Sequence, residues 1–206
     1  YHDRWKALEL AKHRLVYSLL QLGLPVVSKI QDEATGLIFD FKADDKKKVL
    51  TGHALGVITI NISEANDIER EMARRNLDEV YRTVLGHFRH EVGHYYWDRL
   101  ILNTPLLEDF RQLFGDETKN YGKALKTHYK NGAPLNWNRQ FISAYASAHP
   151  WEDWAETWAH YLHMIDTLET AYAFGIGIRP KTAANTTDLD IAVTADPYHT
   201  KDFAVI

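Results

Sequence analysis

Apolar residues near the N-terminus recur at the spacing of one helix face. They are Trp5, Leu8, Leu15, Leu19 and Leu22. Residues spaced three or four apart share one side of an α-helix, so the run predicts an amphipathic helix that covers a core. Gly23 and Pro25 come directly afterwards and predict where this helix ends.

Three short β-type runs follow, separated by turns that carry Gly and Asp. The runs are Val26–Ile30, Leu37–Phe41 and Val57–Ile62. Together they predict a small twisted sheet. The alternation in Val57–Ile62 suits an edge strand, to which an extended peptide could add by main-chain hydrogen bonds, and it suits an ordinary core strand equally well.

The helical spacing then resumes and continues toward the middle of the chain. Its apolar positions are Met72, Leu77, Val80, Tyr81, Val84, Leu85, Phe88 and Val92. Asn66, with Glu69 three residues later, predicts the cap of a long helix. Gly86 and Gly93 each lower helix propensity by up to about 1 kcal/mol. We therefore expect either that something packs closely at these glycines or that the helix breaks near Gly86.

The second half of the chain predicts a further long helix. Another helical stretch follows Thr104-Pro105, and residues 115–137 are typical of loops and short helices around a cleft. Pro150 suits the first position of a helix, and residues 151–170 contain no helix breaker. Gly, Pro, Asn and Thr accumulate beyond this stretch, so residues 170–206 are expected to form a loop-rich C-terminal tail.

Composition narrows the class of protein. The chain has 206 residues, 45% of them hydrophobic, which fits a single domain over residues 1–206. The net charge of −4 and the lack of a long basic run argue against nucleic acid and anionic membranes as partners. The absence of Cys excludes a disulfide framework. The same absence favours a cytoplasmic protein, and no apolar run reaches the roughly 18 residues needed to span a bilayer.

The run from His90 to His94 spells HExxH, a signature of zinc hydrolases. On a helix the two imidazoles project from one face and converge on one metal ion, and zinc is the ion expected. Glu91 is rotated by roughly 100° from His90, so it flanks the metal and suits the role of general base toward water. Chance gives HExxH in a His-rich chain on the order of a few per cent of the time, so its context has to support it.

A catalytic zinc takes three protein ligands and keeps one position open, so HExxH needs a third residue. In metzincins the third ligand is a His six residues after the second His of the motif. That arrangement is excluded here because the residue at this position is Leu100. The segment from Glu152 to Glu156 resembles the ExxA(D/E) pattern of gluzincins, in which a Glu on a second helix completes the site. This resemblance implies that Glu152 binds zinc. Glu156, one helical turn later, is expected to accept a hydrogen bond from a zinc-bound His.

Tyr145 stands seven residues before Glu152, a spacing that resembles lethal-factor-like gluzincins. In those enzymes a Tyr hydroxyl stabilises the oxyanion, which implies the same role for Tyr145. The alternative is an ordinary core aromatic.

Linked motifs over roughly residues 5–175 are similar to the bacterial "putative zinc-binding metallopeptidase" family. They are Gly52-His53 to Ile62, Tyr81-Arg82-Thr83, Leu85 to Glu91, Gly93 to Trp97 and His149 to Glu156. The resemblance implies an α+β, zincin-like metallopeptidase domain with a small twisted sheet and two long active-site helices. It also implies one catalytic Zn²⁺ and a peptide or protein substrate.

Other interpretations of the same residues stay open. The family members commonly carry a Cys-rich zinc ribbon ahead of this region, which this sequence does not contain. Instead of an enzyme, the chain could be a zinc-stabilised binding module for a peptide or partner, or a regulator built on a degenerate peptidase fold. Asp153 competes with Glu152 as the third ligand. Four further histidines are expected to be structural, capping or surface residues: His87, His149, His160 and His163.

Overall fold

The computed structural model describes residues 1–66, 83–178 and 191–200. Five α-helices are described: α1 (His2–Gln21), α3 (Val84–Leu100), α4 (Leu106–Phe114), α5 (Tyr121–Asn131) and α6 (Pro150–Ala173). Short 3-10 helices are η1 (Ile62–Ala65), η2 (Trp137–Arg139) and η3 (Tyr145–Ala148). Strands β1 (Ile38–Lys42), β2 (Gly52–Ala54) and β3 (Val57–Asn61) form one sheet, and β4 (Gly177–Ile178) and β5 (Ile191–Ala192) form another. The described part is therefore of the α+β class.

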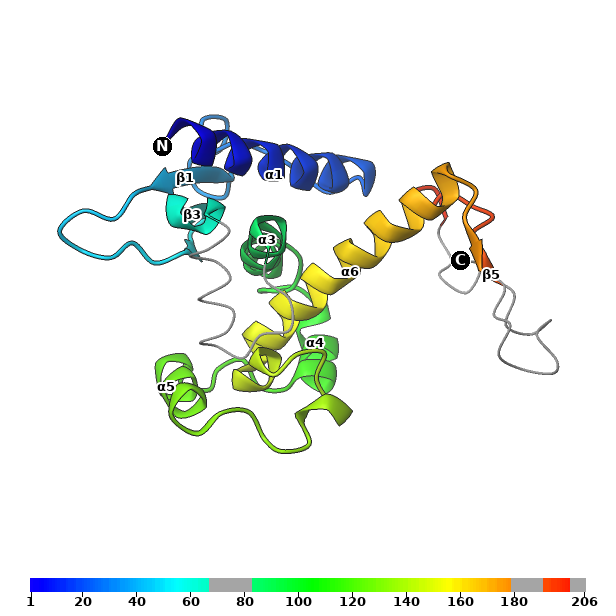
Figure 1. Cartoon of the computed structure of the whole chain (residues 1–206). Coiled ribbons are helices and arrows are strands. Elements are labelled where there is room, and N and C mark those ends of the chain that lie inside the picture. The colour runs from blue at the N-terminus through cyan, green and yellow to red at the C-terminus, as the bar shows by residue number, and fades with distance from the viewer. Residues whose placement is uncertain (67–82, 179–190, 201–206) are drawn as a thin grey trace.

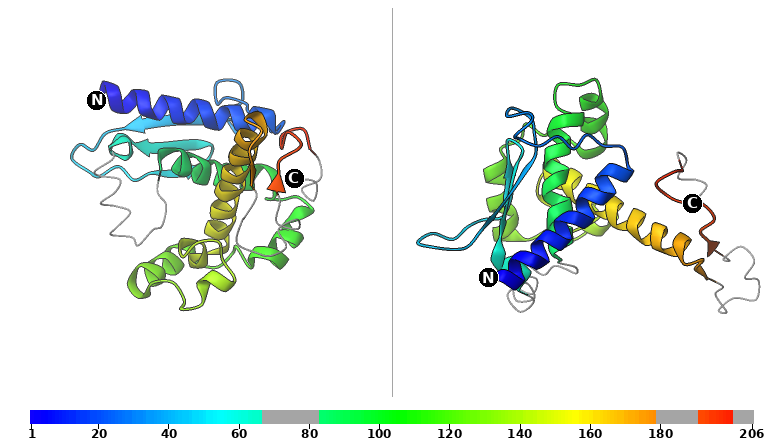
Figure 2. Two further views of the ribbon diagram at one scale, coloured as in Figure 1. Left: turned by 45° about the vertical axis from the view of Figure 1, so that its right-hand side comes forward. Right: turned by 90° about the horizontal axis from the view of Figure 1, so that it is seen from above.

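Helix α3 lies between α1 and α6 (Figure 1, Figure 2). The main core joins one face of α1, the inner face of the sheet and one face of α3. Its fully buried members include Leu8, Leu15, Leu19, Ile58, Ile60, Phe88, Val92 and Tyr96. Burial at helical spacing on α1 confirms the amphipathic helix, and it ends as predicted because Gly23 adopts a positive φ.

The three-stranded sheet differs from the prediction at its first run. Val26–Ile30 is not a strand: it contributes a single bridge, between Ser28 and Leu37. The carbonyl of Ser28 accepts hydrogen bonds from the amides of Gln31 and Asp32, so a turn closes where a strand was expected. The runs at Leu37–Phe41 and Val57–Ile62 are confirmed as β1 and β3 to within a residue at each end.

The order β1-β3-β2 makes β3 the central strand, parallel to β1 and antiparallel to β2. The interpretation of Val57–Ile62 as an edge strand is therefore wrong, and the two edge strands of this sheet are β1 and β2. A two-residue turn connects β2 to β3 through Leu55 and Gly56, both at positive φ. Positive φ at both positions fits the I′ type of hairpin turn, which matches the twist of the strands.

Helix α3 is shorter than the sequence predicts. It begins at Val84, and the extended Thr83 caps it by accepting a hydrogen bond from the amide of Gly86 at 3.0 Å. The expectation of a long helix running unbroken into HExxH is therefore wrong, whereas the alternative of a break near Gly86 is confirmed, since Thr83 is extended. His90 lies in the second turn of α3. Glu69 and the apolar positions from Met72 to Tyr81 fall outside the described residues.

Helix α6 confirms the second long helix. His149 caps it by accepting a hydrogen bond from the amide of Trp151 at 3.1 Å, and Pro150 takes its first position. The first half of α6 lies near α4 and α5, whereas its second half extends toward β4 and β5 (Figure 1). Among the described helices none has both the length and the apolar character that crossing a bilayer requires.

Candidate metal centre

The site lies where α3 and α6 approach most closely. A Cβ added to Gly93 would stand 3.1 Å from Ala155 Cα and 3.2 Å from Trp158 Cβ, so the absence of a side chain there lets the helices touch. The indole of Trp154 donates to the carbonyl of Gly93 at 2.8 Å and fixes this contact. This confirms the expectation of close packing at Gly93. The contact brings the HExxH face of α3 against the first turns of α6.

Three side chains converge at this crossing. His90 Nε2 lies 3.2 Å from His94 Nε2 and 3.0 Å from Glu152 Oε2, and His94 Nε2 lies 3.7 Å from Glu152 Oε1. Two ligand atoms held at about 2.0–2.2 Å by a tetrahedral zinc ion stand roughly 3.3–3.6 Å apart. The two distances from His90 Nε2 lie close to that spacing, and one ligand atom from each of the three residues lies within 4.8 Å of the other two. The part of the chain that the structure describes holds this one group of three able to hold a metal ion.

A carboxylate buried at this point favours a cation beside it. Glu152 is 1% exposed, and its Oε2 faces His90 Nε2 at 3.0 Å. Burial pushes the pKa of Glu152 up, but the neighbouring His90 and His94 outweigh it and bring the pKa down to about 2. Likewise burial works against the protonated form of His90, yet Glu152 and Glu156 raise its pKa well above the usual value. Burial, with His90 beside it, lowers the pKa of His94 to about 3, so this imidazole is neutral and can offer a lone pair. A buried carboxylate beside two imidazoles fits a divalent ion.

Glu91 follows His90 on α3, and its carboxylate helps to raise the pKa of His90. Desolvation raises the pKa of Glu91 to about 7; His90 opposes this rise, whereas the carboxylates of Glu152 and Glu64 add to it. A carboxyl group whose pKa lies near neutral is suited to exchanging a proton with water.

Glu156 lies behind His90, on the side away from His94. Its Oε1 is 2.7 Å from His90 Nδ1, and its Oε2 accepts a hydrogen bond from Ser143 Oγ at 2.6 Å. Metal-binding histidines commonly donate their second ring nitrogen to a carboxylate, which fixes the tautomer. The structure brings these two residues together as the sequence suggested, and it adds Ser143, which the sequence analysis missed.

Tyr145 begins η3 beside the histidines. Its ring centroid is 6.0 Å from that of His90, and its hydroxyl shares a hydrogen bond with Tyr129. Burial is the main reason that the pKa of Tyr145 is raised, so its hydroxyl stays protonated and able to donate. The position is compatible with the predicted oxyanion role, which stays a prediction.

Tyr121, on α5, is a second phenol at the site and was missed by the sequence analysis. Its hydroxyl donates to Glu152 Oε1 at 2.6 Å. The contact joins residues 31 positions apart on separate helices. Neither motif spacing nor helical periodicity could have indicated it.

The remaining candidates do not join the metal group. Asp153 is mostly buried, and burial raises its pKa to about 6. His87 pairs with Glu64 at 3.2 Å, and His149 caps α6. His160 Nδ1 lies 2.8 Å from the carbonyl of Glu156, and His163 Nδ1 accepts from Arg89 at 2.6 Å.

Comparison with known proteins identifies the family of the chain. Three curated relatives, one from Mycobacterium bovis and two from strains of Mycobacterium tuberculosis, are each 48% identical to the chain over 167 residues. All three are described as uncharacterized proteins. The match covers 81% of this chain and 49% of each relative, so the chain spans about half the length of these proteins. No solved structure matches the chain significantly. The family model described as "Putative zinc-binding metallo-peptidase" matches residues 1–206, and the chain belongs to that family.

Proposed function

We propose that the protein is a zinc-dependent peptidase of the gluzincin type with a zincin-like fold. His90, His94 and Glu152 would hold one catalytic zinc ion. The observation that carries the proposal is the convergence of these three side chains, whose candidate ligand atoms, one from each residue, all lie within 4.8 Å of one another. Because three protein ligands leave a tetrahedral ion one open position, such a site is suited to catalysis.

Bound zinc would act as a Lewis acid, lowering the pKa of water to about 7 and polarising the substrate carbonyl. Glu91 accepts the proton of the attacking water as its oxygen bonds to the carbonyl carbon. The carbon–nitrogen bond then breaks, and Glu91 returns the proton to the leaving amine. Tyr145 donates a hydrogen bond to the oxygen on which negative charge develops.

Glu156 supports this chemistry without touching the substrate. Its carboxylate accepts the Nδ1 proton of His90, which leaves the Nε2 lone pair for the metal. Ser143 in turn holds the second oxygen of Glu156. The carboxylate therefore keeps the ring proton of His90 on Nδ1, so that Nε2 can bind the cation.

The decisive experiment compares wild type with Glu91→Gln on a diverse peptide library, with zinc content measured in parallel. We expect the variant to keep stoichiometric zinc and to lose hydrolysis by about 10²–10⁴-fold, because the amide cannot accept the proton. Unchanged turnover would refute the assignment of Glu91. A closed site with four protein ligands, and no cleavage by wild type, would instead favour the zinc-stabilised binding module.

A further inference from the structure

The two carboxylate oxygens of Glu152 have different surroundings. Oε1 accepts a hydrogen bond from the Tyr121 hydroxyl at 2.6 Å. Oε2 lies 3.0 Å from His90 Nε2. One oxygen, Oε1, is thus engaged by a phenol and lies 3.7 Å from His94 Nε2, and the other, Oε2, faces His90. Such a carboxylate is prepared to bind a cation through Oε2 alone.

The surroundings of Tyr121 hold its hydroxyl in this direction. Its ring packs edge-on against His149 and Trp151, with centroids 5.2 Å and 5.8 Å away. His149 Nε2 lies 3.0 Å from the carbonyl of Lys119, just before α5. The start of α5 is therefore attached to the start of α6 at two points. Because α6 carries Glu152 in its first turn, the phenol and the carboxylate move together.

We propose that Tyr121 is a positioning residue that fixes Glu152 as a one-oxygen metal ligand. This inference rests on the proposed function, since it concerns the ion that His90, His94 and Glu152 would hold. A carboxylate free to rotate could offer both oxygens to the ion and take up the position needed by water or substrate. The hydrogen bond to Oε1 opposes that rotation, so it keeps the site open.

The two phenols at the site therefore have different tasks. Tyr145 lies against the ring of His90 and shares its hydrogen bond with Tyr129, whereas Tyr121 is bonded directly to the carboxylate. Losing the Tyr121 hydroxyl should change how tightly the metal is held. This readout does not require that a substrate be known.

The test is the zinc affinity of Tyr121→Phe, measured by competition with a chromophoric chelator. We expect a loss of about 10–100-fold, as for other groups that orient a metal ligand. Tyr17→Phe is the matched control: the Tyr17 hydroxyl also donates to a carboxylate at 2.6 Å, that of Glu169 near the far end of α6. The control should bind zinc as wild type does. Equal affinity in Tyr121→Phe and wild type would overturn the inference.

A double-mutant cycle separates positioning from general loss of structure. In a Glu152→Ala background the phenol has no carboxylate to hold, so adding Tyr121→Phe should weaken zinc binding little further. A full additional loss in that background would show that Tyr121 acts otherwise, and would contradict the proposal.

A crystal structure of the zinc-loaded wild type gives a test that needs no variant. We expect Oε2 within about 2.0–2.2 Å of the ion and Oε1 still bonded to Tyr121. A bidentate Glu152 would overturn the inference while leaving the proposed function intact. A wild type that binds no zinc would instead defeat both.

Discussion

At the scale of single residues, Glu156 is expected to orient His90 without itself binding the metal ion. It contacts His90 Nδ1 at 2.7 Å and is itself held by Ser143. We expect Glu156→Ala to lower zinc affinity or turnover by about 10–100-fold, because the His90 ring loses the partner that fixes its tautomer and orientation. Chelator competition and peptide turnover measure the two effects.

Glu169→Ala is the control for this prediction, since Glu169 is another carboxylate of α6 and is bonded to Tyr17 away from the site. It should leave zinc affinity unchanged. If Glu156→Ala matched wild type in both affinity and turnover, Glu156 would have no role in holding His90.

The residues that sequence could indicate are those whose geometry is set within one helix. The pairs His90 with His94 and Glu152 with Glu156 are each four residues apart, and helical spacing alone puts each pair on one face. Tyr121 and Ser143 reach the same site from other elements, through contacts that depend on how α5 and the segment before η3 pack. No local pattern marks such residues, so only the fold reveals them.

At the scale of elements, the distance between α3 and α6 depends on Gly93. Alanine there gains helix propensity of about 1 kcal/mol, but its Cβ would stand 3.1 Å from the backbone Cα of Ala155, which has little freedom to move. We expect Gly93→Ala to change unfolding free energy little and to weaken zinc binding, because the helices separate where His94 faces Glu152. Chemical denaturation without zinc and chelator competition measure the two quantities.

Gly122→Ala provides the comparison. This glycine lies in the first turn of α5, and an added Cβ would meet only Asn120 Oδ1, at 3.9 Å. The variant should keep the zinc affinity of wild type. A Gly93→Ala protein that bound zinc equally well would mean that the helix contact does not control the site.

The strands show why element prediction succeeded only in part. Periodicity identified β1 and β3, which have five residues each, but β2 has three and leaves too short a pattern to recognise. The Leu55-Gly56 turn lacks the Asn-Gly or Asp-Gly signal usual for such hairpins. In the opposite sense, Val26–Ile30 has β-type composition, yet hydrogen bonds to the Ser28 carbonyl turn the chain there. Competing local hydrogen bonds outweighed intrinsic propensity.

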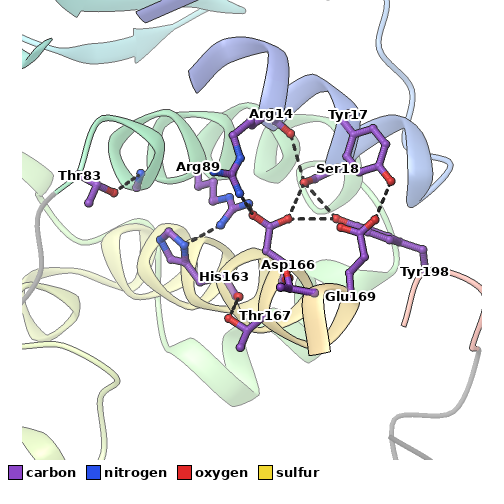
Figure 3. Close-up of polar contacts among 12 residues, drawn as sticks. Arg14, Tyr17, Ser18, Thr83, Arg89, His163, Asp166, Thr167, Glu169 and Tyr198 are labelled. Carbon is purple, nitrogen blue, oxygen red and sulfur yellow. Dashed lines mark hydrogen bonds and ion pairs between the residues drawn. The ribbon is translucent and has the colours of Figure 1, made fainter. Parts of the chain in front are cut away.

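At the scale of the whole molecule, a part-buried polar network joins α1, α3, α6 and the described C-terminal segment (Figure 3). Arg89 is 1% exposed and pairs with Asp166, while its other terminal nitrogen donates to His163. Asp166 also accepts from Ser18 at 3.4 Å and from Tyr198 at 3.4 Å. Because Arg89 directly precedes His90, this network fixes α3 against α6 next to the metal centre.

Removing one partner of the Arg89–Asp166 pair should destabilise the folded protein. Asp166→Ala leaves the Arg89 charge buried without its carboxylate, and we expect unfolding free energy to fall by about 3–5 kcal/mol, measured by denaturation with chelator present so that metal binding does not contribute. Replacing both partners, as Arg89→Met with Asp166→Leu, should recover most of the loss, since an apolar pair carries no desolvation cost. Glu117→Ala, which breaks the more exposed Arg111–Glu117 pair, should have a much smaller effect. A double variant no more stable than Asp166→Ala would show that the network stabilises the fold through its other hydrogen bonds rather than by neutralising Arg89.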